Sequence, residues 1–293
     1  MSIPSLDKSL SPLSTTDKAE DGYRILPDFN QLSVLVGSVM LVYALLPFLS
    51  APGRYYSLQL PGVYLEYELS ISTIASILVA ALAASGINWL LHDHPSQSQN
   101  GKKFNLFQHS ILPALTAWAI GVPLQILEIG IQWWVVFALG GVLLSIVFIS
   151  EYIAFDIADP HHVPASIALT SVSYALLFIL SVALRSGGFR LYLILPALFI
   201  TVFFISLRSI YLGTGKWSPV WSLVIAIIIG QLIIAFHYMP LTSIKFGMLI
   251  LGPAYALSSM AGAQVEGQEW TKTWLEPALM LIAFIILAFV VRV

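Results

Sequence analysis

The stretch SPVWSLVIAIIIGQLIIAFHY, residues 218–238, contains no aspartate, glutamate, lysine or arginine. An α-helix rises about 1.5 Å per residue, so a run of this length crosses the roughly 30 Å hydrocarbon core of a bilayer. A helix also pairs its backbone N–H and carbonyl groups internally, whereas lipid offers them no hydrogen-bond partner. The stretch therefore predicts a membrane-spanning helix.

Similar apolar runs recur along the chain and predict an all-α, polytopic transmembrane bundle of about nine spans. The other eight runs are 32–50, 68–91, 106–127, 131–150, 164–184, 191–211, 241–261 and 273–292. Only LEIGIQWW, residues 127–134, separates the third run from the fourth, so the count falls to eight if that pair does not cross twice. Residues 1–31 are polar and predict a disordered tail. Residues 32–293 then form one transmembrane helical domain.

Composition supports an integral membrane protein and excludes several other classes. The mean hydropathy is +0.87 and only 10% of the residues are charged, against about 25% in soluble domains. The formal net charge of −2 gives no basic field for nucleic acid. The absence of cysteine excludes disulfides and thiolate metal sites. We expect a multi-pass protein of the plasma membrane.

The distribution of lysine and arginine predicts an N-terminus on the inner side. With nine spans, eight cations fall inside: Lys8, Lys18, Arg24, Lys102, Lys103, Arg208, Lys216 and Lys272. Five fall outside: Arg54, Arg185, Arg190, Lys245 and Arg292. The polar tail supplies three of the inner eight, so the two sides are equal without it.

Histidines gather beside the predicted inner connections. The stretch NWLLHDHPSQSQNGKKFNLFQHSI, residues 88–111, contains three of them, and the connection after the fourth span adds two more together with aspartates. Imidazole and carboxylate groups bind Zn²⁺, Mn²⁺ or Fe²⁺, and imidazole also binds haem iron. The candidate metal ligands are His92, His94, His109, Asp156, Asp159, His161 and His162.

We nevertheless expect a hydrated hinge at the inner surface rather than a catalytic metal site. Lys102 and Lys103 lie in the same loop as His92 and His94, and two cations disfavour a divalent ion nearby. No HExxH motif is present. We therefore predict no bound cofactor.

The predicted span interiors contain almost no ionisable groups. Glu128, Arg208, Lys245 and Glu276 fall within about a turn of the predicted span ends. Because intramembrane ionisable groups usually mark ion or proton paths, this pattern argues against a proton- or sodium-coupled transporter. We expect the activity to be insensitive to dissipation of the proton gradient.

Small residues recur at spacings that let helices approach closely in lipid. Gly252-Pro253 also predicts a kink in the eighth span. These positions are candidates for packing within the bundle or for an interface with another subunit. They are Ala80, Ala84, Gly140, Gly252 and Pro253.

The chain length and span number are similar to those of the intramembrane aromatic prenyltransferases, but the motifs of that family are missing. Those enzymes carry two aspartate-rich motifs, after the second and the sixth span. Here the first of these loops contains only Asp93, and YLGTGKWSP, residues 211–219, contains no acid. Membership of that family is therefore excluded.

With no catalytic motif and few predicted intramembrane charges, the leading hypothesis is a non-catalytic scaffold or accessory subunit of a larger membrane assembly. Its partners would be the bilayer and other membrane subunits, with no nucleic acid. The alternative is a carrier or flippase for a lipid or other apolar small molecule. A second alternative is a metal-, haem- or pigment-binding membrane protein that uses the inner histidines.

The nine-span topology can be tested with reporter fusions at Ser98 and at the C-terminus. Seven predicted spans separate these points, so the two reporters are expected on opposite sides of the membrane. Reporters on the same side would mean that an even number of crossings separates them. The segments on either side of Glu128 would then not both cross.

Overall fold

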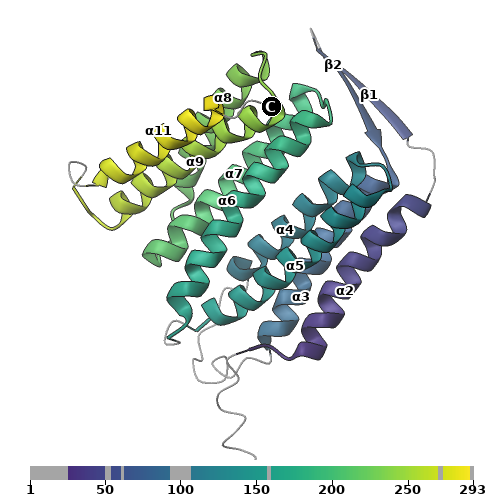
Figure 1. Ribbon diagram of the computed structural model, residues 1–293, viewed down its shortest axis with the longest axis horizontal. Helices are drawn as coiled ribbons and strands as arrows, with labels where there is room; N and C mark the ends of the chain where they lie inside the picture. Colours follow the sequence, from purple (N-terminus) through teal and green to yellow (C-terminus); the bar gives the residue numbers. More distant parts are fainter. Residues whose placement is uncertain are drawn as a thin grey trace, which may run out of the picture.

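The computed structural model describes residues 26–49, 54–60, 63–92, 107–156, 160–269 and 273–290. These ranges contain nine α-helices (Figure 1). Their bounds are α2 Phe29–Leu45, α3 Ile71–His92, α4 Phe107–Ile126, α5 Ile131–Ala154, α6 His162–Ser186, α7 Leu191–Thr214, α8 Pro219–His237, α9 Ser243–Val265 and α11 Leu275–Val290. A short 3-10 helix, Leu46–Phe48, extends α2.

The helices confirm a polytopic helical membrane bundle. Eight of them are long and apolar enough to cross a membrane. The ninth, α11, has 16 residues, or about 24 Å of helix, which is less than the full hydrocarbon thickness. The third and fourth predicted spans are two separate helices, α4 and α5, which pack against each other. Which side the N-terminus faces stays a prediction.

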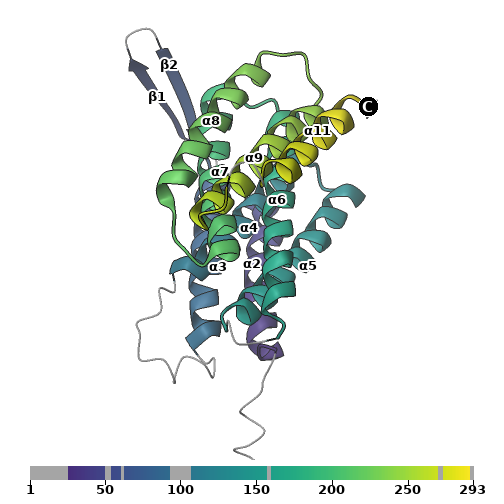
Figure 2. The same ribbon diagram turned by 90° about the vertical axis from the view of Figure 1, so that its left-hand side faces the viewer.

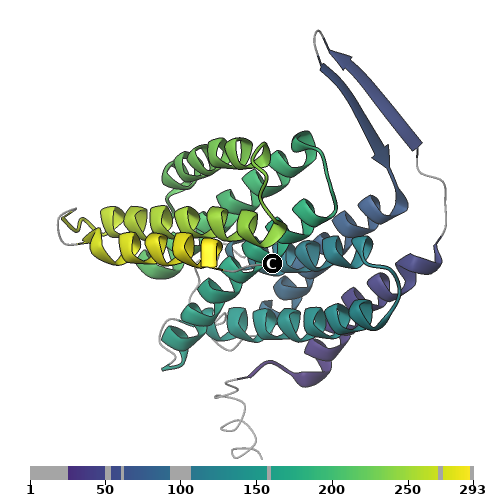
Figure 3. The same ribbon diagram turned by 45° about the horizontal axis from the view of Figure 1, so that its top comes forward.

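The helices fall into two groups, visible in Figure 1 and again in Figure 3, where the purple-to-teal and green-to-yellow helices occupy different sides. One buried core lies within α2–α5 and includes Tyr43, Leu144 and Phe148. A second lies mainly within α6–α9 and includes Leu198 and Phe246. A smaller core of residues from α4, α5 and α6 joins the two groups.

A β-hairpin lies between α2 and α3, in addition to the helical bundle. Strands β1, Arg54–Leu60, and β2, Val63–Leu69, pair antiparallel with Tyr56 opposite Tyr67. The hairpin stands clear of the helices in Figures 1 and 2. Alternating aromatic or aliphatic and polar residues around a Pro-Gly pair are a hairpin signal in the sequence.

The first helix begins earlier than predicted. Asp28 is the N-cap of α2, and its carboxylate accepts a 3.0 Å hydrogen bond from the backbone N–H of Asn30. Capping of this kind satisfies a backbone donor that the first turn leaves without a partner. Residues 29–31, assigned to the polar tail, are therefore helical. Residues 1–25 of that tail lie outside the described residues.

Two of the predicted small positions lie where helices approach closely. A Cβ at Gly140 of α5 would be 2.6 Å from Ile120 Cγ2 on α4, and one at Gly252 of α9 would be 2.9 Å from Phe284 Cβ on α11. Pro253 lies inside α9. Ala80 and Ala84 are half-buried on α3. A role for these residues in binding another subunit stays a prediction.

We predict that Gly140→Ala lowers the stability of the bundle. The added methyl group overlaps Ile120 in a tightly packed interface, and overpacking of this kind costs about 1–3 kcal/mol. Thermal unfolding in detergent measures the effect. Gly37→Ala is the matched control, because a Cβ at exposed Gly37 in α2 meets nothing within 4 Å. Equal stability of the two variants would contradict the predicted close packing.

Candidate functional site

Three ionisable side chains meet in the interior, between the two helix groups. His109 lies near the start of α4, Glu151 near the end of α5 and Arg208 within α7. The Nδ1 atom of His109 is 2.8 Å from Glu151 Oε2, and Arg208 Nη2 donates to the same oxygen. The side chains of Glu151 and Arg208 are fully buried. We call these three residues the buried network.

The geometry assigns the proton positions within the buried network. Since His109 Nδ1 lies beside a carboxylate oxygen, the tautomer with the proton on Nδ1 donates to Glu151. Arg208 Nη2 is 3.3 Å from the same nitrogen, but a guanidinium can only donate. The two donors therefore converge on Oε2 of Glu151 and do not bond to each other.

Aromatic rings enclose the buried network. The edge of Phe155 packs against His109, with ring centroids 5.3 Å apart. The Cζ atom of Arg208 lies 5.4 Å from the ring centroid of Tyr211, close enough for a cation–π interaction. Within the described residues, Glu151 Oε1 and Arg208 Nε and Nη1 are buried without a hydrogen-bond partner. These atoms retain hydrogen-bonding capacity inside the protein.

The buried network places two charged side chains within helices, although almost charge-free span interiors were predicted. Helix α5 continues to Ala154 and α7 to Thr214, beyond the predicted span ends at 150 and 211. Glu151, assigned to a connecting loop, and Arg208, assigned to a span end, therefore lie inside helices. The available signal was the apolar pattern that continues past Glu151 as Tyr152, Ile153, Ala154 and Phe155.

Five of the seven candidate metal ligands lie within the described residues, and they form no cluster of three or more that could hold a metal ion. His92 and His161 are exposed, whereas Asp156 and His162 are half-buried. His94 and Asp159 lie outside the described residues. Among the residues that the structure describes, no group of three or more histidines and carboxylates could hold a metal ion. His109 was expected in a hydrated hinge, but it is buried in α4 and belongs to the buried network.

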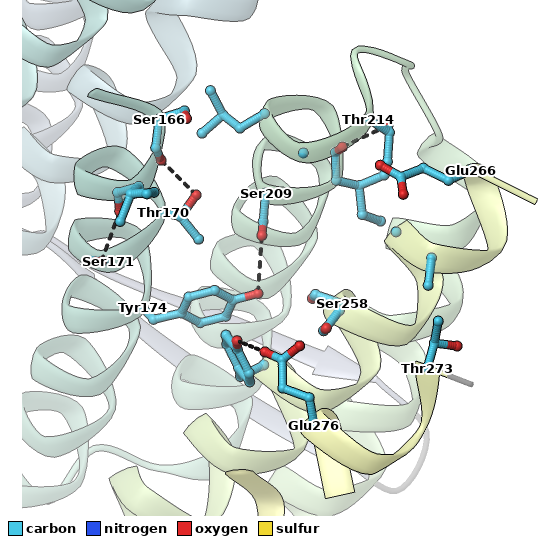
Figure 4. Close-up of a pocket in the computed structure, with 18 of the residues that line it drawn as sticks. Ser166, Thr170, Ser171, Tyr174, Ser209, Thr214, Ser258, Glu266, Thr273 and Glu276 are labelled. Atoms are coloured by element: carbon cyan, nitrogen blue, oxygen red, sulfur yellow. Dashed lines mark hydrogen bonds between the residues drawn. The ribbon is translucent and has the colours of Figure 1, made fainter. Parts of the chain in front are cut away.

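A pocket of about 720 Å³ opens between α6, α7, α9 and the start of α11 (Figure 4). Side-chain hydroxyls dominate its lining. They belong to Ser166, Thr170, Ser171, Tyr174, Ser209, Thr214, Tyr255, Ser258, Ser259 and Thr273. Glu266, Glu276 and Gln268 complete the polar groups, and none of the described lining residues is a lysine, arginine or histidine. We call this space the hydroxyl pocket.

The wall of the hydroxyl pocket on α6 accepts hydrogen bonds. The hydroxyls of Ser166, Thr170 and Ser171 donate to carbonyls of their own helix, at 2.8–2.9 Å. A hydroxyl that has donated its proton keeps lone pairs that can accept. Figure 4 shows these side chains along one wall of the pocket. This wall therefore favours ligands that carry hydrogen-bond donors.

Two tyrosines line the hydroxyl pocket. The Tyr174 hydroxyl donates to Ser209 Oγ at 3.4 Å, and its ring meets Tyr255 in a T-shaped contact at 5.3 Å. Tyr255 in turn donates to Glu276 Oε1 at 2.9 Å. This site was not predicted from the sequence. Its signal was the spacing of Ser166, Thr170 and Tyr174, which places them on one face of a helix.

Fold and sites define a multi-pass integral membrane protein with a buried ion-pair network and a polar pocket within its helices. Residues 51–291 match the family described as "Protein of unknown function (DUF5656)". The chain belongs to this family, since the match covers most of its length. Comparisons with curated proteins and with solved structures give no match.

We predict that Arg208→Met strongly destabilises the protein. Removing one partner of a buried ion pair leaves the other charge uncompensated, at a cost of about 3–5 kcal/mol. The double variant Glu151→Gln/Arg208→Met removes both charges and is expected to recover part of that loss. Detergent unfolding midpoints measure both effects.

Arg190→Met is the control for this experiment, because Arg190 is exposed at the start of α7. It should change the midpoint little, as surface substitutions usually do. If Arg208→Met were as stable as this control, the ion pair would not hold the two helix groups together.

Proposed function

We propose that the protein is a membrane carrier that binds the polar head of a lipid or similar amphiphile in the hydroxyl pocket. The observation that carries this proposal is a large, hydroxyl-lined pocket among helices that can span a membrane. Pockets that bind small molecules range from about 300 to 1,000 Å³, and this one falls within that range. Ten hydroxyl groups suit a head that forms many hydrogen bonds.

The chemistry of the pocket wall favours a neutral, hydroxyl-bearing head. Acceptors on α6 match donors on such a ligand, and Glu266 and Glu276 add further acceptors. Phosphate recognition normally uses arginine, lysine or clustered backbone N–H groups. The described lining residues include no arginine and no lysine. We therefore favour a sugar or polyol head over a free phosphate.

A neighbouring apolar groove supports an amphiphile rather than a freely soluble sugar. The groove has a volume of about 360 Å³ and is lined by Leu275, Leu279, Met280 and Ala283 of α11, together with Glu276. Glu276 also lines the hydroxyl pocket, so the polar and apolar spaces meet at one residue. A head in the pocket could thus leave its acyl chain along α11.

The eight long apolar helices suit a multi-pass integral protein, and we propose the plasma membrane as its location with the N-terminus inside. The scaffold, metal, haem and pigment hypotheses stay predictions. No contact among the described residues favours one of them over the carrier.

The carrier proposal is tested in phosphatidylcholine vesicles that contain a trace of fluorescent monoglucosyl diacylglycerol. Wild-type protein is expected to move probe from the inner to the outer leaflet, where dithionite quenches it. Ser209→Phe places a bulky ring in the half-buried pocket wall, so the rate should fall to that of protein-free vesicles. Fluorescent phosphatidic acid should move more slowly than the glycolipid.

The matched control is Ser85→Phe, the same substitution at an exposed position of α3 in the other helix group. It should transport like the wild type. An unchanged rate in Ser209→Phe, or no movement of glycolipid by the wild type, would refute the proposed function.

A further inference from the structure

We infer that His109, Glu151 and Arg208 form a proton-binding site that drives the carrier. This inference rests on the proposed function, because it supplies that carrier with a coupling ion. The starting observation is that one carboxylate oxygen accepts hydrogen bonds from side chains of both helix groups. Glu151 Oε2 accepts from His109 within the α2–α5 group and from Arg208 in the α6–α11 group.

Charge balance defines the resting state of this site. Arg208 contributes one positive charge and Glu151 one negative charge, so the site is neutral when His109 is neutral. With the proton on Nδ1 donated to Glu151, Nε2 of His109 is the nitrogen that can accept another proton.

Protonation changes the competition for the shared oxygen. When Nε2 takes a proton from a hydronium ion, an N–H bond forms as an O–H bond of that ion breaks to leave water, and the imidazole becomes a cation. Its Nδ1–H hydrogen bond to Glu151 is then charge-assisted and stronger. Because Arg208 donates to the same Oε2 atom, the hydrogen bond from Arg208 to the carboxylate weakens. The link between the two helix groups therefore depends on the proton, and release of that proton from Nε2 restores it.

Among the described residues, no further counterion contacts His109. Helix α4 packs against α2, α3, α5, α6 and α7. Glu151 on α5 and Arg208 on α7 are the charged groups that face His109, and Tyr211 on α7 faces Arg208. Among the described residues, α2, α3 and α6 make no ion pair or hydrogen bond with these three side chains.

The buried network is joined to the hydroxyl pocket through α7. Arg208 and Ser209 are successive residues, and Ser209 accepts the hydrogen bond from Tyr174, another residue of the pocket lining. A shift of this turn of α7 on release of Arg208 would therefore move a pocket wall. Ionisable groups within membrane helices commonly serve as proton relays, and rocking of one helix bundle against another is a common transport motion.

The test uses glycolipid-containing phosphatidylcholine vesicles with a pH-sensitive dye inside and an imposed pH gradient. Wild-type protein is expected to accumulate the fluorescent monoglucosyl diacylglycerol in one leaflet and to move protons as it does so. His109→Asn keeps a nitrogen donor that can reach Glu151 but removes the proton acceptor. It should move the lipid to equal leaflet populations, with no response to the gradient.

His161→Asn is the matched control, because His161 is exposed before α6, and it should remain driven by the gradient. Lipid accumulation by His109→Asn would overturn the inference, as would wild-type lipid movement without proton movement. In that second case the carrier proposal would survive. The wild-type dye measurement decides the question even if His109→Asn fails to fold. A wild type that moves no lipid would overturn both proposals.

Discussion

The ion pair between Arg208 and Glu151 constrains how the two halves of this membrane protein can be arranged. Both side chains are fully buried, and neither charge can be left alone among apolar helices without a large loss of stability. Helix α7 must therefore present Arg208 to the carboxylate on α5, and α4 must bring His109 beside it. The smaller core shared by α4, α5 and α6 lies at the same junction. This polar contact fixes a register that apolar packing would leave less well determined.

Helix α7 connects this constraint to the hydroxyl pocket because its two sides face different neighbours. Successive helical residues are rotated by about 100°, so Ser206 and Arg208 project from nearly opposite sides. Arg208 meets α4 and α5, whereas Ser206 accepts a 3.0 Å hydrogen bond from Ser258 of α9, a residue of the pocket lining. A displacement of α7 therefore alters the buried network and the pocket together.

The bundle was predictable from the sequence because lipid imposes a simple rule on chain composition. Each spanning helix needs an apolar run of sufficient length, and the eight long helices follow from such runs. The same rule fails at Glu151 and Arg208, because a charged residue there does not mark the end of its helix. The buried network also joins residues separated by 42, 57 and 99 positions. No local sequence pattern specifies the contact among these three side chains, since it forms only when three helices pack together.

The hydroxyl pocket can exist among membrane helices because most of its polar groups are uncharged hydroxyls. Thr170, Ser171 and Thr214 donate to carbonyls one turn earlier in their own helices, so their polar hydrogens are satisfied without a ligand. Such back-bonding is the usual way for hydroxyl groups to be accommodated within helices. The charged lining residues, Glu266 and Glu276, are exposed, and the fully buried charges are neutralised as a pair. In the proposed carrier, a ligand head would exchange hydrogen bonds to water for bonds to hydroxyl acceptors, with no buried charge to be uncovered when it leaves. This arrangement would suit repeated binding and release of the ligand in the carrier that we propose.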